Sequence, residues 1–86
     1  MAKVLKVGDT VTWRGCWGTA LPIEVKVEGM EVTEQRRSKY GESVQAVSWD
    51  LVQQNYVLFD LDNGSWAYSD QIAPAGCDPK TWHKEY

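Results

Sequence analysis

Apolar and polar residues alternate along much of the chain, and this two-residue period predicts β-strands. The first clear segment is residues 10–14, in which Val11 and Trp13 lie on one face and polar residues on the other. A Gly8-Asp9 turn precedes it, and a loop bracketed by glycines, residues 15–18, follows it. We therefore expect a half-buried strand that ends in a short loop.

A longer strand is predicted from residue 21 onward, with a shift of phase near its middle. Apolar residues occupy odd positions from Ile23 to Val27, but even positions at Met30 and Val32, after Gly29. Such a shift would turn the wrong face inward unless one inserted residue absorbs it. Glycine at the shift predicts a β-bulge, which bends a long strand sharply.

The middle of the chain has a weaker pattern. Residues 35–43 are polar and predict a solvated loop, residues 44–49 predict a strand of mixed phase, and residues 50–54 predict a link onward. No segment shows a sustained period of 3.6 residues, so we expect no substantial helix.

The stretch LFDLDNGSWAY, residues 58–68, predicts a β-hairpin. Asn63-Gly64 as a two-residue loop favours a type I′ turn, because both central positions need positive φ. That register pairs Leu61 with Trp66 and Phe59 with Tyr68. The inner face would then hold five large side chains: Val57, Phe59, Leu61, Trp66 and Tyr68. Asp60 would face outward, since burial of an unpaired carboxylate costs several kcal/mol.

After the hairpin, residues 69–72 predict a single 3₁₀ turn before a last short strand that ends at Pro74. The expected fold is thus an all-β domain, a small SH3-like barrel of about five antiparallel strands with one 3₁₀ turn before the last strand. The barrel would span residues 1–75, and residues 76–86 would form a C-terminal extension.

The run of residues 57–74 resembles the end of Tudor and related SH3-like barrels, and Gly8-Asp9-Thr10-Val11 is similar to their start. The resemblance covers residues 7–75 and implies the barrel fold. In Tudor domains a cage of aromatic side chains binds methylated lysine or arginine by cation–π attraction. Trp13 and Trp17 stand at places similar to two of these, whereas Phe59 and Tyr68, the nearest candidates for the others, face inward in the predicted register. The sequence therefore matches half of that cage.

The 86 residues include five Trp and four Tyr but only one Phe. Large rings can fill the core of a short chain, and tryptophans also dominate binding surfaces. Core packing is the preferred interpretation for Trp13 and Trp49, which share strand faces with valines. Trp17 lies in a glycine-flanked loop and is the leading candidate for contact with a partner.

Charge divides unevenly between the two halves. Residues 1–40 carry seven Lys/Arg and five Asp/Glu, a balance of +2, whereas residues 41–86 carry two and seven, a balance of −5. The acidic pair Asp60 and Asp62 lies near the hairpin tip, where the preferred interpretation is solvated turn residues rather than acid–base catalysis. As charges at the rim of a site, they would favour a cationic peptide.

One basic cluster supports an alternative. Arg36, Arg37 and Lys39 adjoin Tyr40, and a basic stretch with an aromatic neighbour is how single-stranded nucleic acid is often held. Together with Arg14 they could line one edge of a nucleic-acid-binding barrel. Only a few basic residues would contact the phosphates, so nucleic-acid binding is the alternative hypothesis.

The sequence contains no recognisable catalytic set, phosphate-binding loop or metal-ligand spacing, so we expect no enzyme, no cofactor and no metal. Cys16 and Cys77 are far apart and follow no motif, and two reduced thiols are preferred over a disulfide. The N-terminus lacks the apolar region of a signal peptide and no run approaches the roughly 18 residues of a membrane span, so a cytosolic protein is expected.

Our leading hypothesis is a module that binds a protein or peptide through Trp13, Trp17 and Trp49 with Asp60 and Asp62. The alternatives are the nucleic-acid-binding barrel and a structural subunit of a larger assembly.

Overall fold

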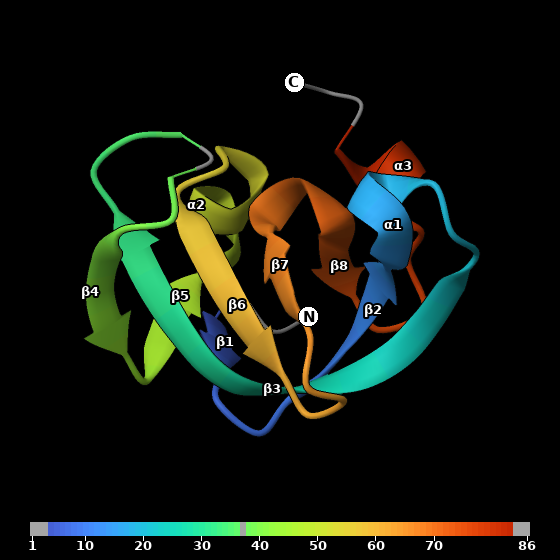
Figure 1. Ribbon diagram of the computed structural model, residues 1–86, viewed down its shortest axis with the longest axis horizontal. Coiled ribbons are helices and arrows are strands. Elements are labelled where there is room, and N and C mark those ends of the chain that lie inside the picture. Colours follow the sequence, from blue (N-terminus) through green and yellow to red (C-terminus); the bar gives the residue numbers. More distant parts are fainter. Residues whose placement is uncertain (1–3, 37, 84–86) are drawn as a thin grey trace.

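The structure is a computed structural model that describes residues 4–36 and 38–83 (Figure 1). It is mostly β, with antiparallel sheets and only short helices. This confirms the expectation of a small β domain. In the described part of the chain, however, the strands do not close into a barrel.

The main sheet has six strands, five of which follow one another in the order β7-β6-β3-β2-β8. The sixth strand, β4, pairs with β3 as well. A separate two-stranded sheet pairs β1 with β5. The strands of the main sheet are β2 (Thr10–Arg14), β3 (Pro22–Thr33), β4 (Gly41–Val44), β6 (Val57–Leu61), β7 (Trp66–Tyr68) and β8 (Ile72–Pro74), and those of the small sheet are β1 (Val4–Lys6) and β5 (Ala46–Ser48).

The long strand β3 organises the main sheet and curves beneath the other strands in Figure 1. Its first half pairs with β2, and its second half pairs with β6 on one edge and β4 on the other. The pairing with β6 shifts register between Val27 and Gly29, so the predicted β-bulge is confirmed at the predicted glycine. Val27 before the bulge and Met30 after it are both buried, because the bulge keeps the apolar face inward.

Between β3 and β6 the chain forms more structure than the sequence pattern suggested. The expected loop ends early, at β4, and a bend at Gln45 divides β4 from β5 where one strand of mixed phase was expected. Residues 50–54, which were expected to form a simple link, belong largely to the helix α2 (Trp49–Gln53). The Ser48 hydroxyl caps this helix by accepting a hydrogen bond from the Leu51 N–H at 3.4 Å, and Val52 is buried beneath it.

The hairpin of β6 and β7 has a register one residue away from the prediction. Phe59 lies opposite Ala67 and Asp60 lies opposite Trp66. The loop contains three residues rather than two: the Gly64 N–H donates to the Leu61 carbonyl at 3.1 Å, and the Leu61 N–H donates to the Ser65 carbonyl at 2.9 Å.

This geometry is a type I turn followed by a left-handed residue. Gly64 has φ of +85°, while Asn63 is not among the described residues with positive φ. The prediction that Trp66 and Tyr68 face inward was therefore wrong. Ala67 is buried in their place, against the same core as Phe59. A small residue fits here because Phe59, Leu61 and Met30 already fill the interior.

The 3₁₀ turn and the last strand agree with the sequence pattern. The turn η1 covers Ser69–Gln71, and β8 ends at Pro74. The buried Ser69 hydroxyl accepts a hydrogen bond from the Val57 N–H at 2.9 Å. Its own proton goes to the Val57 carbonyl. These bonds join the turn to the start of β6.

The C-terminal extension packs on the domain as far as His83. The helix α3 (Pro79–Trp82) starts from Asp78, whose carboxylate accepts a hydrogen bond from the Lys80 N–H at 2.9 Å. The Trp82 ring packs against the core, and the His83 Nε2 atom lies 2.7 Å from the Ile72 carbonyl oxygen. Helix α3 lies beside α1 at the top of Figure 1. None of the described helices is long and apolar enough to span a membrane.

Candidate functional site

Three aromatic side chains form a cluster on the surface: Trp17, Trp66 and Tyr68, which we call the aromatic cluster. The ring centroids of Trp66 and Tyr68 are 5.2 Å apart and those of Trp17 and Trp66 are 5.8 Å apart, both edge-to-face. Trp17 and Tyr68 are tilted by 31° at 6.2 Å. Trp17 is 68% exposed and Trp66 is 40% exposed, so a large part of this ring surface faces solvent.

Strand β7 presents two of these rings because of its register. Successive residues of a strand point to opposite faces, so burial of Ala67 turns Trp66 and Tyr68 outward together. Asp60 is paired with Trp66 and Leu58 with Tyr68, which puts these side chains on the same outer face. Asp60 is exposed on this face, and its carboxylate lies over Gly29 of the neighbouring strand β3.

The third ring comes from the short turn α1 (Gly15–Gly18), whose backbone is left-handed. Cys16 has φ of +51° and Trp17 has φ of +59°, and Gly18 continues the turn with φ of +97°. A left-handed conformation costs roughly 1–2 kcal/mol for a residue other than glycine. Strain of this kind persists only where the surroundings impose it, and it is concentrated at functional sites.

Several contacts hold this turn in place. The backbone of Gly15 packs so closely on the Trp13 ring that an added Cβ would lie 3.1 Å from two of its carbons. The Thr19 hydroxyl donates to the Cys16 carbonyl at 2.7 Å. The buried Gln71 side chain of η1 donates to the Arg14 carbonyl at 3.1 Å, which connects the turn to the end of β7.

The Arg14 side chain is the strongest of these anchors. Its guanidinium donates two hydrogen bonds of 2.6 Å to the two carboxylate oxygens of Asp78 and a third of 2.9 Å to the Ala20 carbonyl. The hydrogen bonds from Arg14, followed by the one from the Lys80 N–H, lower the pKa of Asp78 to about 2. The same pair raises the pKa of Arg14. A bidentate pair of this kind fixes geometry, and here it joins the C-terminal extension to the base of the Trp17 turn.

A shallow hollow of about 510 Å³ lies between the Trp17 turn and the hairpin tip. Three tryptophans contribute to its lining, Trp13, Trp17 and Trp66. Among the described residues, the polar ones that line it are uncharged: Cys16, Ser65 and Gln71. The hollow therefore offers ring faces and neutral polar groups, and Asp60 lies opposite Trp66 in the strand pair.

The basic loop between β3 and β4 reaches the same face. The Lys39 Nζ atom lies 5.1 Å from the centroid of the Trp66 ring, and the Arg36 guanidinium lies 5.9 Å from that of Tyr56. Both distances are within the range of cation–π contacts. The aromatic cluster thus already has one ammonium group over one of its rings.

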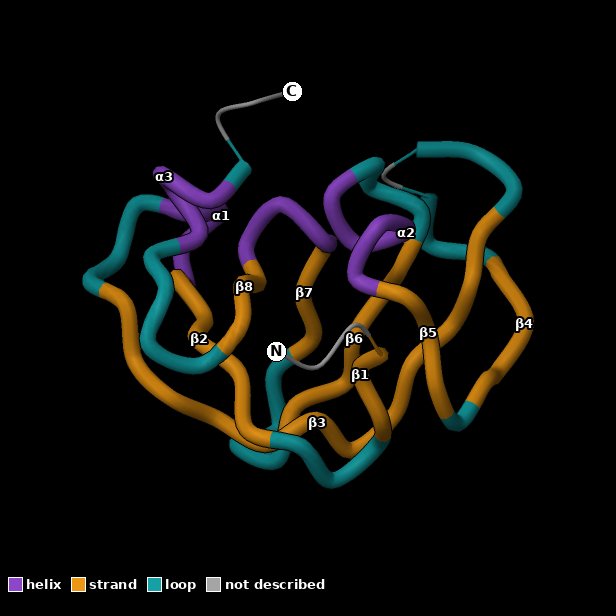
Figure 2. Tube along the Cα trace, turned by 180° about the vertical axis from the view of Figure 1, so that it is seen from behind, coloured by secondary structure: helices purple, strands orange, loops and turns teal. Residues whose placement is uncertain are grey.

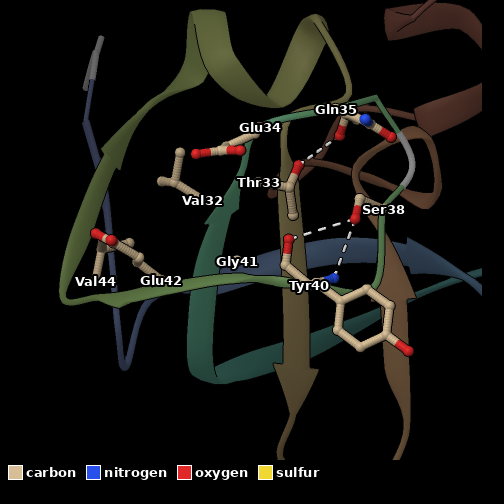
Figure 3. Close-up of a pocket in the computed structure, with 9 residues that line it drawn as sticks. All are labelled: Val32, Thr33, Glu34, Gln35, Ser38, Tyr40, Gly41, Glu42 and Val44. Carbon is tan, nitrogen blue, oxygen red and sulfur yellow. Dashed lines mark hydrogen bonds between the residues drawn. The ribbon is translucent and has the colours of Figure 1, made fainter.

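A second hollow lies inside this loop and is drawn in Figure 3. The Ser38 hydroxyl accepts a hydrogen bond from the Tyr40 N–H at 3.1 Å and holds the loop at this point. The Tyr40 ring lies at the opposite end of the hollow from Val44 (Figure 3) and is 85% exposed. Among the described residues that line this hollow, the charged ones are Glu34 and Glu42. None of these described lining residues also lines the hollow beside the aromatic cluster.

The structure separates the residues that were predicted to bind a partner. Trp13 and Trp17 line the same hollow, and Asp60 lies on the same outer face as Trp66. Asp62 is a turn residue whose carboxylate accepts a hydrogen bond from the Lys26 N–H at 3.2 Å. Trp49 lies in a different groove, against Trp82.

The residues predicted for nucleic-acid binding are also separated. Arg14 is only 15% exposed and is engaged with Asp78, so it does not extend the basic loop. Arg36 and Lys39 lie over aromatic rings, while Tyr40 points to solvent. Arg37 lies outside the described residues.

Sequence reasoning missed the two rings of β7 because it chose the wrong turn. The sequence Leu-Asp-Asn-Gly-Ser allows either a two-residue loop or a three-residue loop with glycine in the left-handed position. The second choice turns Trp66 and Tyr68 outward. Of the candidates taken from the Tudor resemblance, Phe59 is fully buried and Tyr68 is part of the aromatic cluster.

Among residues 4–36 and 38–83, no three His, Cys, Asp or Glu side chains gather in a way that could hold a metal ion. Cys16 and Cys77 are both free and exposed. Comparison of the chain with family models, with curated proteins and with solved structures yields no match.

Proposed function

We propose that this protein is a non-enzymatic binding module that holds a cationic side chain of a protein or peptide partner on the aromatic cluster. The observation that carries the proposal is a group of three mutually contacting rings on the surface, of which Trp17 and Trp66 are exposed and Tyr68 is half-buried. Trp17 lies on a left-handed turn. Large aromatic side chains that become buried on binding supply much of the binding energy at protein interfaces.

We further infer an SH3-like arrangement. An SH3-like barrel would contain five strands in the order β7-β6-β3-β2-β8. It would also have a 3₁₀ turn before its last strand, where η1 lies between β7 and β8. Strands β4 and β5 and helix α2 would then be an insertion between its second and third strands, and β1 would pair with that insertion. In this arrangement the Trp17 turn and the β6–β7 hairpin are neighbouring parts of one binding face.

The ligand chemistry follows from the rings and the nearby charges. A cation over a ring face gains about 0.5–1 kcal/mol at an exposed site and about 2 kcal/mol when desolvated. Lys39 is an internal example, with its ammonium 5.1 Å from the Trp66 centroid. Asp60 opposite Trp66 adds a carboxylate that would favour a positive over a negative partner.

A titration followed by ¹⁵N–¹H NMR tests the proposal. Lysine- or arginine-rich peptides should shift the indole N–H signals of Trp17 and Trp66 and the amide signals of β7. The Trp66→Ala variant should lose these shifts, whereas Tyr40→Ala, which removes an exposed ring outside the cluster, should keep them. Unchanged Trp17 and Trp66 signals at millimolar peptide would remove the idea.

One observation supports the nucleic-acid alternative: the basic loop and the aromatic cluster meet at Lys39 and Trp66. Stacked bases and a few phosphate contacts would use the same surface. Mobility-shift assays with single-stranded RNA and DNA at low and moderate salt discriminate between the two. Salt-sensitive retention would favour nucleic acid, and its absence at low salt would leave the peptide as the partner.

A further inference from the structure

A second groove, remote from the aromatic cluster, has its own tryptophan pair. It has a volume of about 900 Å³ and lies where the small β1–β5 sheet and α2 meet β8 and α3. These elements are nearest the viewer in Figure 2, which is turned by 180° from the view that shows β6 and β7 in front (Figure 1). Of the residues that the structure describes, none lines both this groove and the hollow beside the aromatic cluster.

The apolar part of the groove is formed mainly by Trp49 and Trp82. Their ring centroids are 5.3 Å apart and their planes are inclined by 80°, so the edge of one ring meets the face of the other. Both rings pack against the core on one side and line the groove on the other. Val4, which is 44% exposed, and Pro74 continue the apolar surface.

The described charged residues that line this groove are all acidic. Among the described residues that line it, the ionisable ones are Asp9 and Asp50, and both are exposed. Asp9 is fixed in position because its carboxylate accepts a hydrogen bond from the Lys6 N–H at 3.0 Å. Asp50 lies in the first turn of α2, directly after Trp49. A ligand with a positive charge would meet carboxylates at the rim and rings in the floor.

Side-chain and turn contacts occupy part of the strand edges beside the groove. The His83 ring lies 2.7 Å from the Ile72 carbonyl on β8, and the Asp9 side chain and N–H engage the Lys6 N–H and carbonyl on β1. Occupied backbone groups leave less edge for an added strand. The side chains that line the groove therefore offer the main contacts to a partner.

We propose that the groove between α2 and α3 is a second docking surface, which takes a protein segment that carries arginine next to an apolar residue. Arginine fits this surface better than lysine, because a planar guanidinium can stack on an indole ring while it pairs with a carboxylate. The neighbouring apolar side chain would cover Val4 and Pro74. This surface does not depend on the function proposed for the aromatic cluster.

The test uses the full chain and three heptapeptides that differ at one position, Ac-Gly-Ala-Leu-Arg-Leu-Ala-Gly-NH₂ and its lysine and glutamine counterparts. The arginine peptide should shift the indole N–H signals of Trp49 and Trp82. Its affinity should exceed that of the glutamine peptide by about fivefold, the upper range for an exposed ion pair, with the lysine peptide between them. Asp50→Asn should lower the affinity for the arginine peptide by about threefold or more. Glu28→Gln, an exposed carboxylate on β3 outside this groove, should leave it unchanged.

Three results would overturn the proposal. The first is no shift of Trp49 and Trp82 at millimolar arginine peptide, and the second is equal affinity for the arginine and glutamine peptides. The third is a concentration-dependent dimer in sedimentation equilibrium whose formation alone moves these two signals, because a second copy would then be the occupant. Trp66→Ala should leave the groove signals responsive, so failure of the aromatic cluster and failure of the groove are distinguishable.

Discussion

Phe59 and Ala67 lie opposite each other across the β6–β7 pair, and both side chains are fully buried. This relationship decides which side of β7 faces solvent, because Trp66 and Tyr68 must then point outward. The core needs a small residue at position 67 and has no room for a ring there. The exposure of the aromatic cluster therefore depends on the small Ala67 side chain on the other face of the strand.

Enlarging Ala67 should destabilise the protein more than removing the ring next to it. Ala67→Leu adds three carbons to a filled interior and should lower the free energy of unfolding by about 1–3 kcal/mol. Trp66→Ala removes a partly exposed ring and its edge contacts and should cost no more than about 1 kcal/mol. Urea denaturation of the two variants measures both values, and the reverse order would contradict the observed register.

The ion pair between Arg14 and Asp78 predicts a specific loss of stability in acid. The pKa of Asp78 is lowered to about 2, so the carboxylate stabilises the fold above the usual carboxyl pKa of about 3.9 in the unfolded chain. That contribution is lost as the pH falls through the folded value. The wild type should thus be more stable than Asp78→Asn above about pH 5, and the difference should shrink between about pH 4 and pH 2. Thermal unfolding across this range measures it, with Glu24→Gln as an exposed control. A constant difference at all pH values would contradict the role assigned to the pair.

The left-handed turn predicts that replacement by glycine has opposite effects on stability at the two cysteines. Cys16→Gly relieves a residue with φ of +51° and should raise the free energy of unfolding by up to about 1 kcal/mol. Cys77 is equally free and exposed, but it has no positive φ, so Cys77→Gly should lower that free energy by about 0.5–1 kcal/mol. Chemical denaturation under reducing conditions compares the variants. Equal effects would show that the turn is not strained.

Lys39 should compete with a cationic ligand for the Trp66 ring. If the proposed function holds, Lys39→Gln should increase the affinity for a lysine-rich peptide about two- to fivefold, the equivalent of an exposed cation–π contact of about 0.5–1 kcal/mol. Lys26→Gln, on β3, is the control. If the ligand is a nucleic acid, Lys39→Gln should instead weaken binding, since a phosphate contact would be lost.

The contact between Lys39 and Trp66 can be measured without any ligand. The methylene protons next to the Lys39 ammonium should resonate upfield in the wild type, because the ring current of Trp66 shields them, and Trp66→Ala should return them to their ordinary position. Ordinary shifts in the wild type would mean that Lys39 does not occupy the ring face, and the expected gain in affinity would then have no basis.

Much of the β framework could be predicted from the sequence because the alternation of side chains is strong where one face is buried. The strand at residues 10–14, the bulge at Gly29 and the 3₁₀ turn before Pro74 all follow from local patterns. The SH3-like assignment stays a proposal, since the described strands do not close. The small helices were missed because each is only one turn long, too short for a helical period, although Ser48 and Asp78 are typical N-cap residues.

The aromatic cluster was harder to predict because two turn types are compatible with the same five residues. In both, Gly64 adopts positive φ, and the choice between them depends on what the core can accept opposite Phe59. Long-range contacts are likewise outside the reach of local patterns. The partners of Arg14 and Trp49 come from the C-terminal extension, 64 residues away for the Arg14–Asp78 pair.

The attachment of the C-terminal extension to β8 has a consequence for how the protein behaves in solution. His83 occupies the Ile72 carbonyl, and Trp82 covers the adjoining apolar surface. A chain that is truncated after Pro74 would expose an unpaired border of the sheet next to bare hydrophobic surface. Two such chains would be able to pair along that edge, so we expect residues 75–83 to protect the domain against self-association.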